Sequence, residues 1–355
     1  MATSPSTQAQ PRPEQHLMQM ASGYMITAAV YNAAKLDVAG QLVQGPRPVS
    51  DLARLTGANE DALYRILRAL SAVGIFAEPQ PRTFALNPPA EALRQDAPNS
   101  MRDMLLWVCD PFHFRVWGDM EYSLRTGKPA IEHVTGKPCF EYFDSDPEEA
   151  RVFNNAMTGF SANIVPTVLD AYDFSGIGTL VDIAGGHGAV LCEILNAYPK
   201  MKGVLFDLPS VIDGANCRLC DIGMQGRCAT VSGSFFDSVP AGGDAYIMKH
   251  IIHDWDDVEA LKILRNCHQA LEAKPHGKLL LIEGLISSDP ENVFPKLLDL
   301  EMLLFPGGRE RTEEEFRQLL AKAGFRLTRV VHTKSRFVVL ESEPAAHGEV
   351  VSWPQ

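Results

Sequence analysis

Basic side chains are in deficit in this chain of 355 residues. Lys and Arg number 32 against 44 for Asp and Glu, which gives a formal net charge of −12. A surface of this sign repels a phosphate backbone, because binding to nucleic acid depends on cationic side chains that neutralise phosphates. We therefore predict that nucleic acid is not a partner.

Long apolar runs and cysteines are also scarce. The longest aliphatic stretches, such as 279–282, have the length of a strand, whereas a helix that crosses a bilayer needs about 20 apolar residues. The first fifteen residues carry prolines among Ser, Thr and Gln, without the basic start and apolar block of a signal peptide. Seven scattered cysteines, an odd number, suit reduced thiols better than a disulfide framework. We expect no membrane partner, a cytoplasmic location and an N-terminal tail.

Three of the cysteines, Cys217, Cys220 and Cys228, lie close together in the sequence. A zinc site normally uses about four nitrogen or sulfur ligands at characteristic spacing, and no second Cys-x-x-Cys or His pair follows. We interpret these cysteines as unligated and predict no metal.

The length exceeds one ordinary core, and the content of 46% hydrophobic and 21% charged residues is typical of a globular chain, so two domains are expected. In the first, over 17–93, apolar residues recur at helical spacing. Ser50 and Asn59 are expected to cap two successive helices that end at Gly57 and Gly74. Short strands over 75–77 and 83–86 complete a helix, turn, helix and hairpin, which is a winged-helix outline.

Winged helices often bind DNA through the second helix of the pair. Here that helix offers only Arg65 and Arg68, beside Glu60 and Asp61, whereas a helix that reads DNA normally has a denser basic face. The pattern favours packing or dimer contact over DNA binding.

Large side chains are concentrated in the next helical stretch, over 101–160. Most of them are expected to be core, but their density also fits a flat apolar pocket. They are Trp107, Phe112, Phe114, Trp117, Phe140, Tyr142, Phe143, Phe153, Met157 and Phe160.

From residue 173 onward, short β-type runs alternate with helical segments. This alternation predicts a parallel sheet covered by helices, with ligands bound beyond the carboxyl ends of the strands. The runs are 179–183, 203–206, 228–231, 245–249 and 278–283.

The first of these strands ends in a glycine-rich loop that does not match the dinucleotide fingerprint. Counting from Gly186 gives Gly188 and then Leu191, so the third glycine of G-x-G-x-x-G is missing. Asp182 would place a carboxylate where a pyrophosphate would bind. Both observations disfavour NAD and favour a cationic ligand such as S-adenosylmethionine (SAM). Asp207, at the end of the second strand, is suited to bind ribose hydroxyls.

A candidate base follows the fourth strand. His253 lies at the expected edge of the cleft, whereas His268 falls on the apolar stripe of the next helix and is expected to pack in the core. Methyl transfer from a sulfonium needs a positioned acceptor and a group that removes its proton, and imidazole has a suitable pKa. Glu283 and Glu310 are expected to orient His253 and to stabilise its protonated form.

Together these residues carry a resemblance to a known family. The segments 182–188, 206–209, 233–236, 249–255 and 307–312 resemble those of the small-molecule O-methyltransferases, which include the plant caffeic acid and acetylserotonin enzymes and bacterial natural-product enzymes. The resemblance spans about 17–340. It implies an α/β fold: a Rossmann-like, seven-stranded catalytic domain behind an N-terminal all-α winged-helix dimerisation domain, and a homodimer.

The resemblance also implies roles for individual residues. His253 matches the general base, and Glu283 and Glu310 match its flanking carboxylates. The implied cofactor-binding residues are Asp182, Gly185, Gly186, Asp207, Leu208, Ser234, Phe235, Phe236 and Lys249. The implied acceptor-binding residues are Trp117, Phe112, Asn155, Met157, Phe160, Asp254, Met302 and Phe305.

Two positions depart from the family pattern. Ala184 replaces the usual first glycine of the loop, and Ser234 stands where relatives usually have an aspartate facing the adenine. Alanine still permits a close turn and a hydroxyl can still accept a hydrogen bond, so cofactor binding is expected to survive.

The sequence therefore predicts a SAM-dependent O-methyltransferase that acts on an aromatic small molecule. The expected segments are a tail over 1–16, the winged-helix domain over 17–100, a helical pocket segment over 101–172, the catalytic domain over 173–343 and a tail over 344–355. Three alternatives are a relative with other chemistry, a nicotinamide-dependent oxidoreductase and a winged-helix regulator that senses a ligand.

Overall fold

The computed structural model describes residues 12–274 and 276–345, and the chain forms two compact units, Met1–His113 and Phe114–Gln355. Most of the predicted tails, residues 1–11 and 346–355, lie outside the described residues. The first helix, α1 (Pro13–Ala21), begins within the last part of the predicted N-terminal tail.

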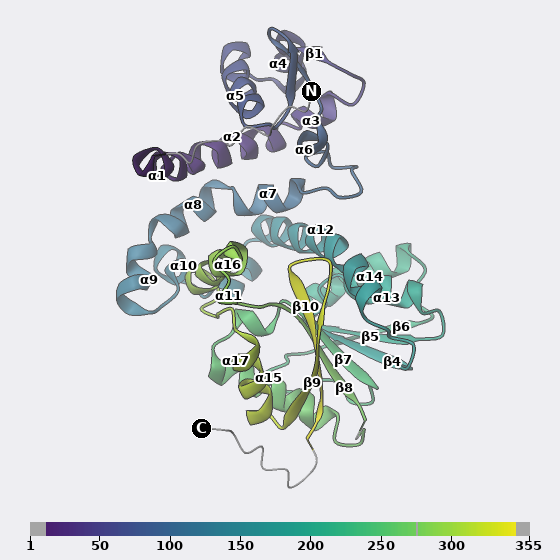
Figure 1. The fold of residues 1–355 in the computed structure, drawn as a ribbon. Helices are drawn as coiled ribbons and strands as arrows, with labels where there is room; N and C mark the ends of the chain where they lie inside the picture. The colour runs from purple at the N-terminus through teal and green to yellow at the C-terminus, as the bar shows by residue number, and fades with distance from the viewer. Residues whose placement is uncertain (1–11, 275, 346–355) are drawn as a thin grey trace, which may run out of the picture. The chain divides into compact units, whose positions relative to one another are not determined.

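The first unit is mainly helical and holds a small antiparallel sheet (Figure 1). Its core is formed by apolar side chains at helical spacing, among them Leu52, Leu63 and Leu67, packed with Phe84. The sheet has the order β1-β3-β2, with β1 (Arg47–Pro48), β2 (Ala77–Gln80) and β3 (Thr83–Ala85). The helices after α1 are α2 (Gly23–Lys35), α3 (Val38–Gln41), α4 (Val49–Thr56), α5 (Glu60–Ala72), α6 (Pro88–Glu91) and α7 (Arg102–Val108).

One of the two predicted helix caps is present. Asn59 accepts a hydrogen bond from the main-chain nitrogen of Ala62 and caps α5 as expected, and Gly57 ends α4 with φ 69°. The predicted Ser50 cap is wrong, because α4 already begins at Val49 and Pro48 occupies the cap position. Pro48 has the extended backbone that an N-cap needs, so the helix begins before the serine.

The first strand of the predicted hairpin is displaced in the structure. It runs over Ala77–Gln80 rather than 75–77, because Phe76 has φ 66° and turns the chain just before the strand. Pro79 is tolerated in this strand because β2 lies at the edge of its sheet, where a missing N–H breaks no ladder.

The second unit contains a seven-stranded sheet with the order β6-β5-β4-β7-β8-β10-β9 (Figure 1). Neighbouring strands from β6 to β8 are parallel, and β10 pairs antiparallel with both β8 and β9. This confirms the seven strands of the fold implied by the family resemblance. The strands are β4 (Thr179–Ile183), β5 (Lys202–Asp207), β6 (Cys228–Ser232), β7 (Ala245–Lys249), β8 (Lys278–Gly284), β9 (Phe325–His332) and β10 (Phe337–Pro344).

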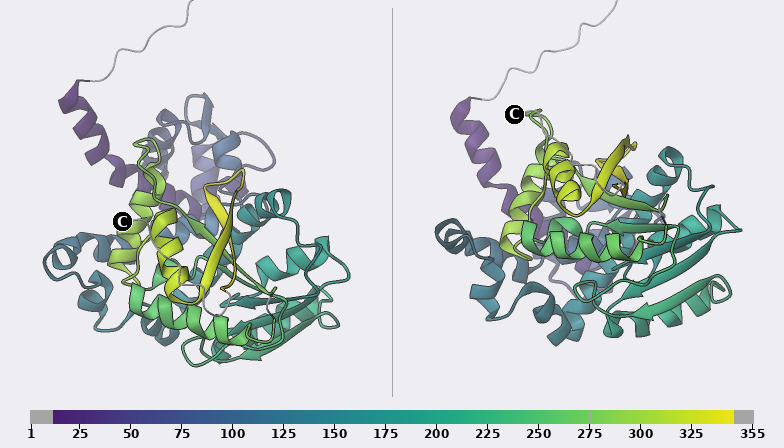
Figure 2. Two further views of the ribbon diagram at one scale, coloured as in Figure 1. Left: turned by 60° about the horizontal axis from the view of Figure 1, so that its bottom comes forward. Right: turned by 90° about the horizontal axis from the view of Figure 1, so that it is seen from below.

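Helices cover both faces of the sheet, as Figure 2 shows. One core layer lies between the sheet and α12 (Pro147–Ala171), α13 (Ala189–Ala197) and α14 (Pro209–Asp221). The other lies under α15 (Asp257–Ala270) and α17 (Glu313–Lys322). The remaining helices are α8 (Pro111–Gly118), α9 (Met120–Thr126), α10 (Ala130–Thr135), α11 (Cys139–Ser145), η1 (Ile252–Asp254) and α16 (Val293–Leu304).

The parallel register places the carboxyl ends of β4, β5, β7 and β8 along one edge of the sheet. The glycine-rich segment follows β4, Asp207 and Lys249 are the last residues of β5 and β7, and Glu283 is the last but one of β8. Within the described ranges, no helix is long and apolar enough to cross a membrane.

Candidate active site

The loop between β4 and α13 is packed tightly around Asp182. A Cβ added to Gly185 would lie 2.5 Å from Leu205 Cδ1 and 2.6 Å from the Asp182 carboxylate, so only glycine fits there. Ala184 adopts φ 53°, a conformation that costs a residue with a Cβ about 1–2 kcal/mol. Ala184 thus makes the left-handed turn of the loop, as expected from the sequence, at some cost in strain.

Asp207 closes one side of this loop. Its Oδ2 accepts a hydrogen bond of 2.8 Å from the Gly186 N–H, and its Oδ1 accepts one of 2.7 Å from the Leu208 N–H. Burial nevertheless raises the pKa of Asp207. Each carboxylate oxygen can accept a further bond, so the group is fixed in place and still able to bind a pair of hydroxyls.

Aromatic rings gather beyond β6. Phe235 and Phe236 lie edge-on to Trp255, with ring centroids 5.8 Å and 4.7 Å from the indole. The Ser234 hydroxyl accepts a hydrogen bond of 3.2 Å from the Phe236 N–H, which fixes the turn that presents these rings. Trp255, which the sequence analysis did not assign to the site, is thus part of the same aromatic cluster.

Lys249 supplies a cation at the end of β7. Its Nζ lies 5.7 Å from the centroid of the Phe160 ring. Burial lowers the pKa of Lys249, while the negative charges of Asp182, Glu283 and Asp254 act in the opposite direction. The lysine therefore connects electrostatically the glycine-rich loop with the acidic groups around His253.

The predicted base and its two carboxylates lie together. His253 Nδ1 is 2.6 Å from Glu310 Oε1 and 3.9 Å from Glu283 Oε2, and the three side chains are buried. His253 Nε2 lies 3.4 Å from Asp254 Oδ1. Glu283 Oε1 also accepts a hydrogen bond of 3.0 Å from the Ile252 N–H, which anchors the turn that carries His253.

Burial and neighbouring charges shift the pKa values of His253, Asp254, Glu283 and Asp182. Burial lowers the pKa of His253, but the carboxylates of Asp254, Glu283 and Glu310 outweigh it and raise this pKa to about 10. Burial raises the pKa of Glu283 to about 7, of Asp254 to about 6 and of Asp182 to about 7. The site holds more acidic than basic side chains, so it is suited to a cationic ligand.

The predicted acceptor-binding residues fall into three groups. Phe160 lies at the cluster through its contact with Lys249, and Asp254 contacts His253 directly. Trp117 Nε1 donates a hydrogen bond of 2.7 Å to Glu301 Oε2 of α16, the helix that also carries Met302. In the third group, Phe305 directly follows α16, Asn155 and Met157 are half-buried on α12, and Phe112 lies in the first unit. The contact of these four residues with an acceptor stays a prediction.

His250 is a residue of the site that the sequence analysis did not select. Its ring centroid lies 5.1 Å from that of His253, 5.3 Å from that of Phe160 and 4.3 Å from that of Phe337. Among residues 12–274 and 276–345 its buried Nε2 finds no hydrogen-bond partner, and its φ is 55°. The sequence showed two histidines after the strand, but not that the chain turns at the first of them.

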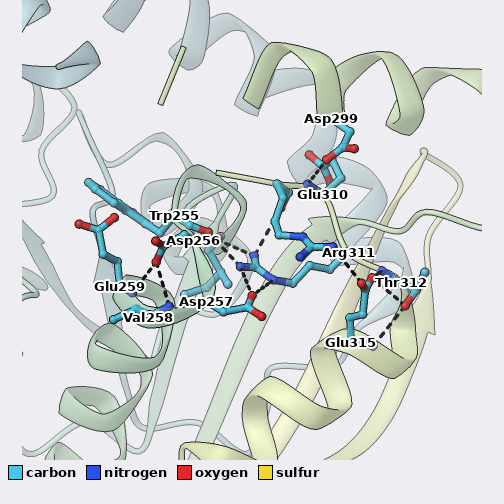
Figure 3. Close-up of polar contacts among 12 residues, drawn as sticks. Trp255, Asp256, Asp257, Val258, Glu259, Asp299, Glu310, Arg311, Thr312 and Glu315 are labelled. Atoms are coloured by element: carbon cyan, nitrogen blue, oxygen red, sulfur yellow. Dashed lines mark hydrogen bonds and ion pairs between the residues drawn. The ribbon is translucent and has the colours of Figure 1, made fainter. Parts of the chain in front are cut away.

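The loop that carries Glu310 is itself held in place. The Glu310 N–H donates a hydrogen bond of 2.8 Å to Asp299 Oδ1 of α16, and both residues are labelled in Figure 3. The Arg309 N–H donates one of 2.8 Å to the His253 carbonyl. Thr312 and Glu315 form a capping box at the start of α17.

Both units match models of known domains. Residues 117–326 match the O-methyltransferase domain, and residues 18–96 match the O-methyltransferase dimerisation domain. The phenazine O-methyltransferase PhzM of Lysobacter antibioticus is 42% identical over 328 residues, which cover 92% of this chain and 95% of that protein.

Solved structures show the same architecture. The crystal structure of LaPhzM has a TM-score of 0.89 and 41% identity, and covers 94% of this chain and 100% of that one. The structure of NcsB1 from neocarzinostatin biosynthesis, in complex with SAM and 2-hydroxy-5-methyl naphthoic acid, has a TM-score of 0.79 and 32% identity. It covers 95% of this chain and 100% of that one.

Proposed function

Since the chain belongs to the O-methyltransferase family and is a SAM-dependent O-methyltransferase, we propose that it methylates a hydroxyl group on an aromatic small molecule, with His253 as general base. The observation that carries this proposal is the contact of 2.6 Å between His253 Nδ1 and Glu310 Oε1 in a buried, acidic site.

The residues along the strand ends fit the groups of SAM. The buried Asp182 Oδ2, which has no partner within the described part of the chain, is suited to the ammonium group, and Asp207 to the ribose hydroxyls. Phe235, Phe236 and Ser234 offer rings and a hydroxyl to the adenine, while Gly185 and Gly186 let the backbone approach closely. Leu208 and Lys249 complete this proposed cofactor site.

The bound cofactor supplies an electrophilic methyl group on a sulfonium, and the chain supplies the base. Glu310 accepts the Nδ1 proton of His253, so Nε2 of the neutral imidazole is the atom that takes the proton of the acceptor hydroxyl. With a cation held in the cluster, the pKa of His253 would fall by repulsion, which would free Nε2 for this task. Glu283 and Glu310 then stabilise the imidazolium that forms.

An aromatic acceptor is supported by the side chains that surround the cluster and by the relatives. PhzM is named for a phenazine, and NcsB1 was solved with a naphthoic acid. Phenols, hydroxyindoles, phenazines and aromatic polyketides all present a flat ring with an acidic hydroxyl. The proposed lining in the second unit consists of Trp117, Asn155, Met157, Phe160, Asp254, Met302 and Phe305, while the role of Phe112, in the first unit, stays a prediction from the sequence.

The chain carries the dimerisation domain of the family, and we extend this to a homodimer formed through the first unit. We further propose a metal-free reaction, because a sulfonium donor with a protein base needs no Lewis acid. A cytoplasmic location and the lack of a nucleic acid or membrane partner remain predictions.

The test is a comparison of His253→Asn with His133→Asn. His133 Nδ1 also lies 2.6 Å from a carboxylate, that of Asp119, but it is exposed and outside the proposed site, which makes it a matched control. We expect His253→Asn to bind SAM like the parent and to lose about 100-fold or more in kcat. The acceptor is first identified by incubation with SAM and a panel of hydroxylated aromatics, with mass spectrometry to detect one added methyl. Unchanged kcat in His253→Asn would remove the proposed base.

A further inference from the structure

Arg311 is almost completely buried, with 1% of its surface exposed, in the loop that carries Glu310. Its Nη1 donates a hydrogen bond of 3.0 Å to the carbonyl of Ile252, and its Nη2 donates one of 2.9 Å to the carbonyl of Trp255. Nη2 and Nε lie 2.8 Å and 3.1 Å from Asp257 Oδ1. Figure 3 shows the guanidinium pointing toward Trp255 and Asp257.

These acceptors belong to the turn that carries His253. Ile252 is the residue before the proposed base, and Trp255 follows it by two positions, so the guanidinium fixes the main chain on both sides of His253. The residue before Arg311 is Glu310, the partner of the imidazole. A single side chain thus joins the segment of the base to the segment of its carboxylate.

The two segments are also packed main chain against main chain. A Cβ added to Gly308 would lie 2.0 Å from the His253 carbonyl oxygen, so no side chain fits between them. Because no side chain separates the two segments, the hydrogen bonds between them fix the position of His253 relative to Glu310. Lysine cannot replace the arginine here, because one ammonium lacks the planar set of donors that reaches three acceptors at once.

We propose that Arg311 is a positioning residue that holds the imidazole of His253 against the carboxylate of Glu310 during proton transfer. The proposal rests on the proposed function, because it assumes that His253 is the base.

The experiment compares Arg311→Lys and the milder Asp257→Asn with Arg227→Lys in the full-length protein. Asp257 is largely exposed, so its substitution weakens the ion pair and leaves the bonds of Arg311 to the two carbonyls. Arg227, directly before β6, is a matched control. Its guanidinium also donates to main-chain carbonyls, those of Leu195 and Pro199. The readouts are the melting temperature, the Kd for SAM, and kcat and KM for the acceptor over a range of pH.

We expect Arg311→Lys to lower kcat about 10- to 100-fold, because a small displacement of a reacting group has an effect of this size. The Kd for SAM and the KM for the acceptor should stay within about threefold of the parent, since the guanidinium of Arg311 is buried and bonded to Ile252, Trp255 and Asp257. Asp257→Asn should lower kcat less, in the same manner, and Arg227→Lys should not lower it.

The pH profile separates positioning from a purely structural role. His253 faces the carboxylates of Asp254, Glu283 and Glu310 and the ring of His250, while Lys249 interacts with Asp254 and Glu283 from the end of β7. Loosening Glu310 removes part of the negative charge that raises the pKa of His253. The limb of the kcat profile that reports ionisation of the base should therefore move to lower pH in Arg311→Lys, and less in Asp257→Asn.

Two results would overturn the proposal. One is a kcat and pH profile like those of the parent in both variants, and the other is a lower melting temperature with a normal pH profile in the folded fraction. Failure of the proposed function is recognised separately: if His253→Asn retains activity, His253 is not the base, whatever Arg311→Lys does. If His253→Asn is inactive and Arg311→Lys is normal, only the positioning role is rejected.

Discussion

His253 and Glu310 are 57 residues apart in the sequence, yet Nδ1 of the one lies 2.6 Å from Oε1 of the other inside the protein. Together with Asp254 and Glu283, the carboxylate raises the pKa of the imidazole. In the proposed mechanism it also selects the tautomer. These two effects can be separated, because an amide in place of the carboxylate keeps the size of the side chain and removes its charge.

Glu310→Gln should lower kcat by about 100-fold or more and move the ionisation of His253 to lower pH, because the charge that favours the imidazolium is gone. The measurement is the pH dependence of kcat at saturating SAM. Glu315→Gln is a suitable control, since Glu315 caps α17 and serves the helix rather than the imidazole. A profile for Glu310→Gln that coincides with the parent's would contradict the assigned role.

Cofactor binding should release protons near neutral pH. Burial raises the pKa of Asp182 and of Glu283 to about 7, so part of each is protonated in the empty site at neutral pH. A bound cation favours the ionised carboxylates, so affinity for SAM should rise as the pH increases from about 6 to about 8. Calorimetry in buffers of different ionisation enthalpy measures the released protons.

Asp182→Asn provides the internal check on this proton release, because it removes one of the titrating groups. The variant should bind SAM more weakly and release fewer protons. S-adenosylhomocysteine, which lacks the sulfonium charge, should show a smaller pH dependence with the parent protein. An affinity for SAM that falls with rising pH would show that the sign is wrong.

Gly185→Ala should weaken SAM binding by about tenfold or more and lower the melting temperature. The added Cβ would press on Leu205 and on the carboxylate of Asp182, both of which are buried in the sheet. Gly159→Ala is the control, because a Cβ at that position of α12 meets no atom within 4 Å and alanine favours the helix by about 0.5–1 kcal/mol. Titration of SAM, followed by thermal shift, compares the two variants, and equal affinities would contradict the proposed close approach at Gly185.

Asn59→Ala should destabilise the first unit by about 1 kcal/mol, since it removes the hydrogen bond that caps α5. Ser50→Ala should change little, because Ser50 is exposed and does not cap α4. Chemical unfolding followed by circular dichroism distinguishes the two. A larger effect for Ser50→Ala would mean that the helix begins later than in the structure.

Three of the parallel strands, β4, β7 and β8, could be located from the sequence because they are buried on both faces and therefore appear as short apolar runs. All five predicted runs coincide with strands to within two residues. The last two strands, β9 and β10, were not located individually. Half-exposed β9 mixes apolar residues with Arg326 and Arg329, so it forms no continuous apolar run. β10 begins with the apolar run 337–340, which the sequence analysis did not use, and then carries the buried Glu341.

The members of the site could be named from motifs, but not the contacts between them. His253 and the two glutamates were predicted from residue type and resemblance, and the structure brings them together. His250 and Arg311 were missed for different reasons. His250 reaches the site because the backbone turns there with a positive φ. Arg311 reaches it through acceptors more than 50 residues away in the sequence. Neither feature produces a local pattern in the sequence.

Burial of the acid–base cluster also determines how the enzyme responds to ionic strength. Dissolved salt screens exposed pairs such as Arg65 and Asp61, but its ions do not enter the space between His253 and Glu310. We therefore expect kcat to stay unchanged in concentrated sodium chloride, in which the attraction between exposed charges is screened. This tolerance of salt would follow from the burial of His253 and would require no change in the charged residues on the protein surface.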